Sequence, residues 1–214
     1  MDILLHIILV LVCYLVGSFP TAYLVVKKWA HKDVRRLGSG NIGTMNVHRA
    51  TESKLLTVLV LVADMAKGAV AIILAKILPA ASPVAPIAAG AAAVVGHNYS
   101  LYMRFKGGRG LATAAGALII YSPPLLLMWV AIWIIPYMVS KILLVGTLAA
   151  TILTPVGAFL LSSADTNIVA KEAVIFAAVV AVIVLVRHIS KIRKLLEGTE
   201  PKKYWKIRND VEMR

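Results

Sequence analysis

The sequence predicts an all-α membrane protein with several transmembrane helices. Hydrophobic residues make up 60% of the 214 positions, and the mean hydropathy is +0.84. Apolar runs close to the ~20 residues that a helix needs to cross a bilayer recur along the chain. A soluble core does not require so much apolar sequence, so the composition excludes a soluble enzyme. The single cysteine, Cys13, cannot form an intramolecular disulfide, so helix packing must hold the fold.

Seven apolar segments are candidate transmembrane helices: residues 3–26, 55–78, 84–99, 111–121, 125–139, 142–161 and 168–186. The first is longer than the roughly 7 to 15 residues of a signal-peptide core and has no basic residues before it, so we expect it to be retained. Pro20, Pro136 and Pro155 are expected to kink or locally break their helices.

The fourth and fifth segments are short and flank Pro123-Pro124. At ~1.5 Å per residue, neither crosses a ~30 Å hydrocarbon core without flanking turns or local thinning of the bilayer. A single crossing of this region, however, would place the basic C-terminal segment outside, against the positive-inside rule. Two short crossings are therefore predicted.

The lysines and arginines predict the orientation, because short loops rich in them stay in the cytoplasm. Of the 23, seven follow the first predicted helix, three follow the third, one follows the fifth and nine lie from Arg187 to Arg214. These twenty face the cytoplasm if the N-terminus is outside and the C-terminus is cytoplasmic. We therefore predict a seven-helix transmembrane domain, residues 1–190, and a basic cytoplasmic tail, residues 191–214, that lies on anionic lipid.

The first polar segment that indicates a binding site runs from Gly38 to Arg49. Its glycines permit positive φ and bring backbone N–H groups close to a ligand, while the side chains between them add hydrogen-bond donors. The candidate residues are Gly38, Ser39, Gly40, Asn41, Gly43, Thr44, Asn46 and Arg49. This is the chemistry of an anion-binding loop, and the alternative is a solvated turn between two helices.

A second glycine-rich segment lies between the third and fourth predicted helices. Its candidate residues are His97, Lys106, Gly107, Gly108, Arg109, Gly110 and, in the following helix, Thr113. Backbone N–H groups, a helix N-terminus and cations all favour an anion at such a position. A positive-inside loop would explain the cations but not the glycines. His97, at a helix end, could instead serve only as a cap.

Two further pairs complete the candidate site. His188 and Lys191, at the end of the seventh predicted helix, are three residues apart and share one helix face. Asp64 and Lys67 have the same spacing inside the second predicted helix and can neutralise each other. Ionisable groups inside a membrane span are costly, which makes them functional candidates, with an internal structural pair as the alternative.

These segments, in this order, resemble those of the bacterial acyl-phosphate:glycerol-3-phosphate acyltransferase family. The similarity includes Gly17-Ser18-Phe19-Pro20, residues 38–49, Asp64 with Lys67-Gly68, Gly96-His97 through Ala112-Thr113, and Arg187-His188 through Gly198-Thr199-Glu200. The resemblance implies a seven-helix catalytic domain in the bacterial inner membrane, with the active site facing the cytoplasm. It implies transfer of a fatty acyl group from acyl phosphate to the 1-hydroxyl of glycerol 3-phosphate, giving lysophosphatidate and phosphate, the first step of phospholipid synthesis.

Four positions depart from the family pattern. Thr44-Met45 stand where the family usually has Ala-Thr, which moves a hydroxyl by one position. Arg109 stands where lysine is usual, so the charge is kept while its geometry changes from a point to a fork. Lys191 replaces an asparagine and loses a hydrogen-bond acceptor.

The sequence also indicates which chemistry is absent. No histidine has an aspartate five positions later, as in the His-x4-Asp dyad of acyl-CoA-type acyltransferases, and there is no Gly-x-Ser-x-Gly elbow. An acyl phosphate needs less activation, because phosphate leaves readily once cations and backbone donors neutralise its charge. The acceptor's own phosphate is expected, from the family, to help deprotonate the hydroxyl.

We assign the candidate residues to the two substrates as follows. Ser39, Asn46 and Arg49, with Ser140 as an addition, are expected to hold the acyl phosphate, and Arg109, His188 and Lys191 to hold glycerol 3-phosphate. Ser39, Arg49, Arg109 and His188 are the predicted catalytic residues. No metal ion, cofactor or nucleic-acid partner is expected, and membrane lipids are the remaining partner.

Two other functions are alternatives to this one. A transporter or channel for small organic anions would also place basic loops at one membrane face. However, the ionisable residues crowd the predicted cytoplasmic ends and only Asp64 and Lys67 lie deep, whereas transporter sites lie near the midplane. A noncatalytic assembly subunit would leave the glycines of both loops unexplained. The sequence therefore favours an enzyme.

Overall fold

The computed structural model describes residues 2–78, 82–164 and 168–199, and every regular element in these ranges is helical. The elements are α1 (Asp2–Ser18), α2 (Thr21–Ala30), η1 (Val34–Arg36), α3 (Thr44–Thr51), α4 (Lys54–Ile77), α5 (Ala85–Asn98), η2 (Leu101–Met103), α6 (Leu111–Tyr121), α7 (Pro123–Ser140), α8 (Leu143–Ser163) and α9 (Lys171–Leu196). The two η elements are single 3₁₀ turns. The all-α prediction is confirmed for the described part of the chain.

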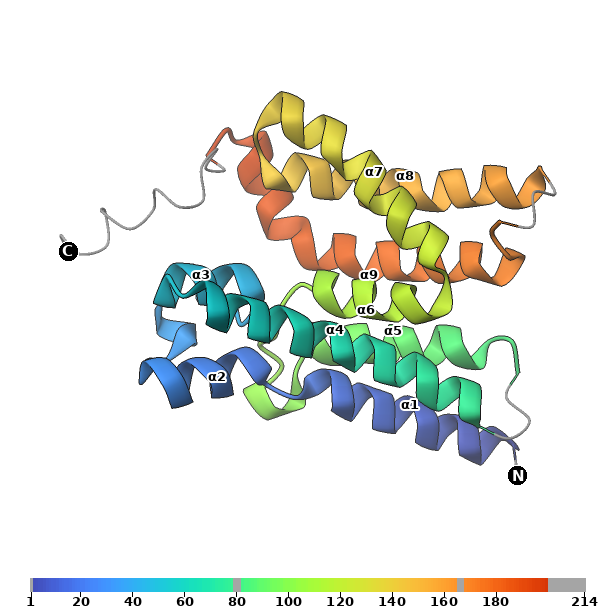
Figure 1. Ribbon diagram of the computed structural model, residues 1–214, viewed down its shortest axis with the longest axis horizontal. Coiled ribbons are helices and arrows are strands. Elements are labelled where there is room, and N and C mark those ends of the chain that lie inside the picture. The colour runs from blue at the N-terminus through green and yellow to red at the C-terminus, as the bar shows by residue number, and fades with distance from the viewer. Residues whose placement is uncertain (1, 79–81, 165–167, 200–214) are drawn as a thin grey trace.

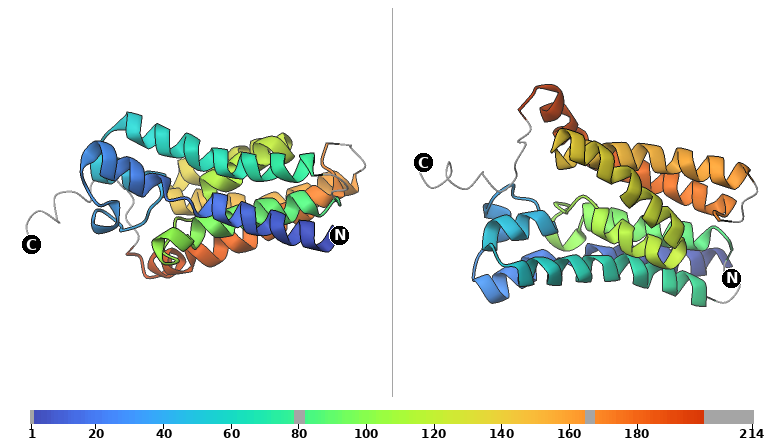
Figure 2. Two further views of the ribbon diagram at one scale, coloured as in Figure 1. Left: turned by 90° about the horizontal axis from the view of Figure 1, so that it is seen from below. Right: turned by 45° about the horizontal axis from the view of Figure 1, so that its top comes forward.

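The long helices run along one axis of the molecule (Figure 1). Helices α1, α4 and α5 form one side, α7 and α8 form the other, and α6 and α9 lie between them (Figures 1 and 2). Helices α2 and α3 lie at the end of the molecule where α4 begins. This arrangement brings the connection between α2 and α3 and the connection between α5 and α6 to the same end.

Helix length differs sharply along the chain. The segments long and apolar enough to cross a membrane are Ile3–Ala30, which comprises α1 and α2, and helices α4, α7, α8 and α9. Helices α5 and α6 have 14 and 11 residues, or about 21 Å and 16 Å at ~1.5 Å per residue. As a result α6 begins partway along α4 (Figure 1). In the segment between α5 and α6, Gly107, Gly108 and Gly110 are buried, whereas residues 101, 102 and 104–106 are exposed.

The prolines act in three different ways. Pro20 breaks the first apolar segment, because α1 ends at Ser18 and α2 begins at Thr21, as expected. Pro136 and Pro155 lie inside α7 and α8, which continue through them as helices. Pro123 begins α7 two residues earlier than predicted, since the first turn of a helix does not need the N–H that proline lacks.

Two helices extend into segments that the sequence analysis treated as loops. Residues Thr44–Thr51 form α3, which buries Val47 and Ala50, so the glycine-rich segment is a loop only as far as Gly43. The valine and alanine, three residues apart, pack into the same apolar cluster as Val60 of α4. Helix α9 continues to Leu196, and the predicted domain boundary after residue 190 falls inside it. Most of the predicted tail, residues 200–214, lies outside the described residues.

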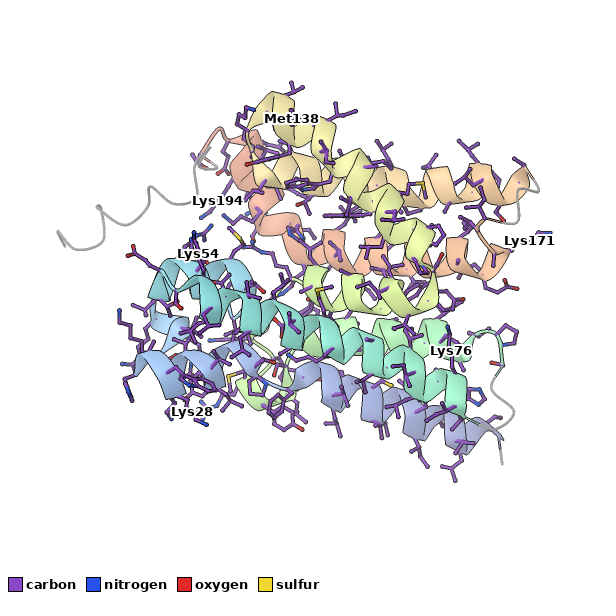
Figure 3. All side chains as sticks on the ribbon, viewed as in Figure 1. Lys28, Lys54, Lys76, Met138, Lys171 and Lys194 are labelled. Carbon is purple, nitrogen blue, oxygen red and sulfur yellow. The ribbon has the colours of Figure 1, made fainter. Side chains whose placement is uncertain are left out.

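Different lysines lie at the two ends of the molecule. Lys28, Lys54 and Lys194 lie at one end, which we call the cationic end, and Lys76 and Lys171 lie at the other (Figure 3). The first three belong to the twenty cations predicted to face the cytoplasm, and the last two do not. The fold is therefore compatible with the predicted separation of charge, and the hydropathy and helix lengths agree with a membrane protein.

Glycines allow α4 and α6 to approach each other closely. A Cβ on Gly116 would overlap the backbone carbonyl of Met65, and one on Gly68 would overlap the carbonyl of Thr113. Small residues at such crossings let helix backbones pack without intervening side chains. Gly157 in α8 differs, because its nearest neighbour is the flexible end of the Met128 side chain.

We expect Gly116→Ala to destabilise the protein by about 1 to 3 kcal/mol, because the added methyl forces the two backbones apart. Gly157→Ala is the matched control, since it carries the same gain of ~1 kcal/mol in helix propensity without a backbone clash. Thermal unfolding in detergent should show a lower midpoint for Gly116→Ala and an unchanged or higher midpoint for Gly157→Ala. Equal midpoints for the two variants would contradict the close crossing.

Candidate active site

The cationic end holds a cavity of about 800 Å³ between the α2–α3 connection, the α5–α6 connection and α9. Its lining comprises Asp33, Arg35, Arg36, Ser39, Gly40, Asn41, Ile42, Tyr102, Met103, Arg104, Lys106, Gly107, Arg109, Arg187 and Ser190. Six of these are arginine or lysine, and among the described residues that line the cavity only Asp33 is acidic. Such an excess of positive charge attracts anions and raises their local concentration.

The acidic member of the lining is already paired. The Asp33 carboxylate accepts hydrogen bonds from Nη2 of Arg35 at 2.7 Å and from Nε of Arg35 at 3.0 Å. These bonds to the guanidinium lower the pKa of Asp33 to about 2. Asp33 is therefore ionised at physiological pH and is a poor proton acceptor. Its charge cancels that of Arg35, and the other cations determine the field in the cavity.

Asn46 holds the first loop in its shape. From the first half of α3, its Oδ1 accepts from the backbone N–H and the hydroxyl of Ser39 at 2.8 and 3.2 Å. Its Nδ2 donates to the carbonyls of Val34 and Leu37, both at 2.9 Å. These four contacts use the full hydrogen-bonding capacity of the amide. Asn46 thus positions Ser39 at the cavity. In this conformation its amide has no free hydrogen-bond donor or acceptor for a ligand.

The second loop is held from two sides. The Gly108 N–H donates to the carbonyl of His97, at the end of α5, at 2.9 Å. From α9, Arg187 donates from Nε to the Gly108 carbonyl at 2.9 Å and from Nη2 to the Gly107 carbonyl at 3.0 Å. The buried carbonyls of Gly107 and Gly108 and the N–H of Gly108 thereby find partners within the protein.

Glycine is required in this loop for two reasons. At Gly108 a Cβ would overlap the imidazole of His97, so the close approach needs a residue without a side chain. Gly110 has φ +78° and immediately precedes α6, a conformation that L-residues with a side chain rarely adopt. Arg109, between them, directs its side chain to the cavity lining.

His188 lies where α9 passes the second loop. It is buried, and its Nδ1 is 2.7 Å from the carbonyl of Val184 one turn earlier. With the proton on Nδ1, this nitrogen donates to the carbonyl and leaves Nε2 for another partner. Arg109, Lys191 and Arg187 are close enough for their charges to act on His188. The structure therefore brings together the three residues that the sequence analysis assigned to glycerol 3-phosphate.

A buried polar cluster lies behind the second loop. Lys67 Nζ is 2.6 Å from Asp64 Oδ1 and donates to the carbonyl of Phe19, also at 2.6 Å. His97 Nδ1 lies 3.7 Å from the same Asp64 oxygen. The predicted pairing of Asp64 with Lys67 is confirmed. The three side chains are between 1% and 7% exposed and do not line the cavity.

A second, apolar cavity of about 380 Å³ lies beside the cationic one. Its lining comes from α4, α6, α7, α8 and α9 and consists of Leu61, Met65, Leu111, Ala112, Ala114, Ala115, Leu118, Leu126, Trp129, Val130, Thr151, Thr154, Pro155, Ala177, Val180, Ala181 and Val184. Leu111 follows Arg109 by two residues, and Val184 precedes Arg187 by less than one turn of α9. The two linings therefore include near neighbours in the chain at the start of α6 and in α9.

A family model described as Glycerol-3-phosphate acyltransferase matches residues 7–198 of this chain. The chain belongs to the glycerol-3-phosphate acyltransferase family. The resemblance found in the sequence is therefore confirmed. Membership covers all three polar segments, both cavities and the buried cluster, because these lie within the matched residues.

Proteins of the glycerol-3-phosphate acyltransferase family match nearly the whole chain. A relative from Rubrobacter xylanophilus is 40% identical over 199 residues, which cover 93% of this chain and 96% of that one. A relative from Neisseria meningitidis serogroup B is 41% identical over 196 residues, covering 90% and 94%. Both are named glycerol-3-phosphate acyltransferase.

Two solved structures of PlsY (YgiH), an integral membrane glycerol 3-phosphate acyltransferase, share the fold. The glycerol 3-phosphate form matches with a TM-score of 0.77 and 31% identity, over 92% of this chain and 94% of that one. The lysophosphatidic acid form matches with a TM-score of 0.76 at the same identity and coverage. The chain is thus an integral membrane protein of the same family and fold.

The predicted site residues of this acyltransferase-family chain fall into three groups. Those that line the cationic cavity are Ser39, Gly40, Asn41, Lys106, Gly107 and Arg109. Those that are not in the lining and lie in the two loops, in α9 or in the helices next to them are Gly38, Gly43, Asn46, Arg49, Asp64, Lys67, His97, Gly108, Gly110, Thr113, His188 and Lys191. Ser140 forms the third group: its hydroxyl donates to the carbonyl of Pro136 at 2.6 Å, and the cavity lining does not include it.

The sequence analysis did not select several residues that line the cavity. They are Arg35, Arg36, Tyr102, Arg104, Arg187 and Ser190. Arg35 and Arg36 were counted only as topological charges, because a positive-inside loop explains any cation near the cytoplasm. Arg104 lies in the second polar segment and Arg187 next to His188 in the resemblance to the family, but neither was chosen as a site residue.

The buried pair of Asp64 and Lys67 predicts how a single and a double substitution change the free energy of unfolding. Lys67→Met leaves the Asp64 carboxylate without its counter-ion, and we expect a loss of about 3 to 5 kcal/mol. In the double variant Asp64→Asn with Lys67→Met both charges are absent, and most of that loss should be recovered. Thermal unfolding in detergent measures both. A Lys67→Met protein as stable as the parent that no longer binds glycerol 3-phosphate would instead make Lys67 a substrate contact.

Proposed function

We propose that this protein transfers a fatty acyl group from acyl phosphate to the 1-hydroxyl of glycerol 3-phosphate, releasing lysophosphatidate and phosphate. Family membership supports the acyltransferase activity and the acceptor. The observation that carries the proposal is a pair of cavities whose linings include near neighbours in the chain, Arg109 with Leu111 and Arg187 with Val184. One cavity is cationic and glycine-rich and suits phosphates, and the other is apolar and suits a hydrocarbon chain.

The two loops divide the phosphates between them. Ser39, Gly40 and Asn41 line the cavity from the α2–α3 connection, with Arg49 behind them, and hold the acyl phosphate. Arg109, His188 and Lys191, which meet where α9 crosses the second loop, hold glycerol 3-phosphate. Asn46 takes the role of positioning Ser39. Asp64, Lys67, His97 and Thr113 support the second loop from the core, and Ser140 is not required.

The chemistry follows from the charges. The 1-hydroxyl oxygen attacks the carbonyl carbon of the acyl phosphate, a new ester bond forms, and the bond between that carbon and the phosphate oxygen breaks. Cations and backbone N–H groups stabilise the developing negative charge on the leaving phosphate. Asp33 is a poor base because it is paired with Arg35. The hydroxyl proton therefore passes to the acceptor's own phosphate group, with His188 beside it.

The apolar cavity receives the acyl chain. It is lined almost entirely by aliphatic and aromatic carbon, which matches a hydrocarbon and offers nothing to a phosphate. Because Leu111 of its lining follows Arg109 by two residues, we expect the carbonyl of a bound acyl group to lie toward Arg109. A transporter for small anions has no use for such a space, which supports the enzyme over that alternative.

The membrane topology we propose has seven crossings, formed by α1 with α2 and by α4 to α9. The N-terminus lies outside and the C-terminus is cytoplasmic, which places the cationic end and the active site at the cytoplasmic face of the bacterial inner membrane. The separation of Lys28, Lys54 and Lys194 from Lys76 and Lys171 supports this orientation (Figure 3). The short α5 and α6 both pack against the longer helices α4 and α9.

The experiment that tests the function is an acyl-transfer assay with purified protein and labelled glycerol 3-phosphate. Palmitoyl phosphate should yield lysophosphatidate without any other factor, whereas palmitoyl-CoA should not, because the chain lacks the His-x4-Asp dyad. Equal or faster turnover with palmitoyl-CoA would contradict the proposed donor. The measurement is labelled product per unit time for each donor.

The same assay tests whether the cationic cavity is the active site. Arg109→Ala removes a charge that stabilises the transition state, and a loss of about 100-fold or more in turnover is expected, at roughly 3 kcal/mol for such a group. Lys28→Ala removes an exposed cation from the same end of the molecule, outside the cavity lining. It should change turnover by less than about threefold, because exposed charges are screened. Similar losses in the two variants would argue against the cavity as the active site.

The topology predicts which positions can be labelled from outside. In a background with Cys13→Ala, a cysteine at Ser82 should react with an impermeant thiol reagent added to intact cells or right-side-out vesicles. A cysteine at Arg193, near the end of α9, should react only after permeabilisation. Both positions are exposed in the fold. The reverse pattern would place the active site outside, and labelling of both from outside would require an even number of crossings between them.

A further inference from the structure

The Arg187 side chain joins α9 to the second loop through hydrogen bonds to the loop backbone. It donates to two consecutive carbonyls, those of Gly107 and Gly108, at 3.0 and 2.9 Å. Arginine suits this position because its planar fork can reach two neighbouring oxygens at once. The guanidinium carbon also lies 5.1 Å from the ring centroid of Tyr99, so the aromatic ring supports the cation.

Tyr99 is held in turn by a residue of α1, so the contact with Arg187 is connected to the helix bundle. Its carbonyl accepts a hydrogen bond from the Tyr14 hydroxyl of α1 at 2.8 Å. The chain of contacts therefore runs from α1 through Tyr99 and Arg187 to the glycines of the second loop. These residues belong to elements that are far apart in the sequence.

The two bonds determine the orientation of the peptide groups in the loop. In a trans peptide the C=O and the N–H point in opposite directions. Because Arg187 binds the Gly107 carbonyl, the Gly108 N–H points the other way, where it donates to the His97 carbonyl at 2.9 Å. By the same geometry, the bond to the Gly108 carbonyl fixes the peptide plane that precedes Arg109. The direction in which Arg109 leaves the backbone depends on that plane.

We propose that Arg187 is a positioning residue: it clamps the Gly107 and Gly108 carbonyls and thereby fixes Arg109 for the phosphate of glycerol 3-phosphate. The proposal rests on the function proposed above and deepens it. Arg187 acts through the loop and not as the main ligand of the phosphate. Lysine cannot replace it, because a single ammonium lacks the fork that holds both carbonyls in one plane.

The test compares Arg187→Lys with Arg193→Lys. Both changes keep the charge and lie on α9, but Arg193 is exposed and outside the cavity lining. In Arg187→Lys we expect KM for glycerol 3-phosphate to rise about tenfold or more, as for loss of hydrogen bonds to a charged group. KM for palmitoyl phosphate should stay within about twofold. Arg193→Lys should match the parent in both.

A second measurement separates positioning from direct binding. Hydrogen–deuterium exchange of the peptide spanning residues 101–112 should be faster in Arg187→Lys without any substrate, because the clamp is lost. A raised KM with unchanged exchange would make Arg187 a direct phosphate ligand and overturn the proposal. A fall in the unfolding midpoint together with equal changes in both KM values would overturn it as well, since it would make Arg187 a general structural residue.

The exchange measurement also separates this inference from the function on which it rests. If the parent protein fails to acylate glycerol 3-phosphate, the proposed function is wrong, whatever the exchange result. If the parent is active and Arg187→Lys has normal kinetics and normal exchange, the function stands and the clamp is wrong.

Discussion

Gly107 and Gly108 of the α5–α6 connection are buried, where each peptide group needs a hydrogen-bond partner, and the other features of the site depend on this constraint. Helices α5 and α6 are short, and their ends do not reach the level where α4 begins (Figure 1). The His97 carbonyl and the Arg187 guanidinium supply the partners. The result is a pair of glycines held by α5 and α9 at the cationic cavity.

The break at Pro20 is connected to the same site through the buried lysine. Ending α1 at Ser18 leaves the Phe19 carbonyl outside a continuous helix, and Lys67 donates to it at 2.6 Å. Lys67 also neutralises Asp64, which faces His97. A buried charge of either sign would be costly alone. The cluster therefore ties α1, α4 and α5 together directly behind the loop that the ligand meets.

The architecture explains how a protein without a nucleophilic triad can carry out acyl transfer. The work left to the protein is to hold two phosphates near one another and to keep the hydrocarbon chain out of the charged space. Cations from three separated segments converge on one cavity, so their charges act together on a phosphate in a space partly shielded from water. Asn46 of α3 already holds the first loop, and the His97 carbonyl of α5 already holds the second. Both loops therefore need little reorganisation when substrate binds.

The sequence by itself determined the all-helical class, the position of Pro20 as a break, the Asp64–Lys67 pair and the three polar segments, because these depend on hydropathy and on spacing within one element. It did not determine that residues 44–51 form a helix, that all hydrogen bonds of the Asn46 amide go to the first loop, or that Ser140 lies outside the cavity lining. Those depend on which elements meet. Arg187 is the clearest case: in the sequence it is one more cation at a helix end, and only the approach of α9 to Gly107 and Gly108 gives it two carbonyls to hold.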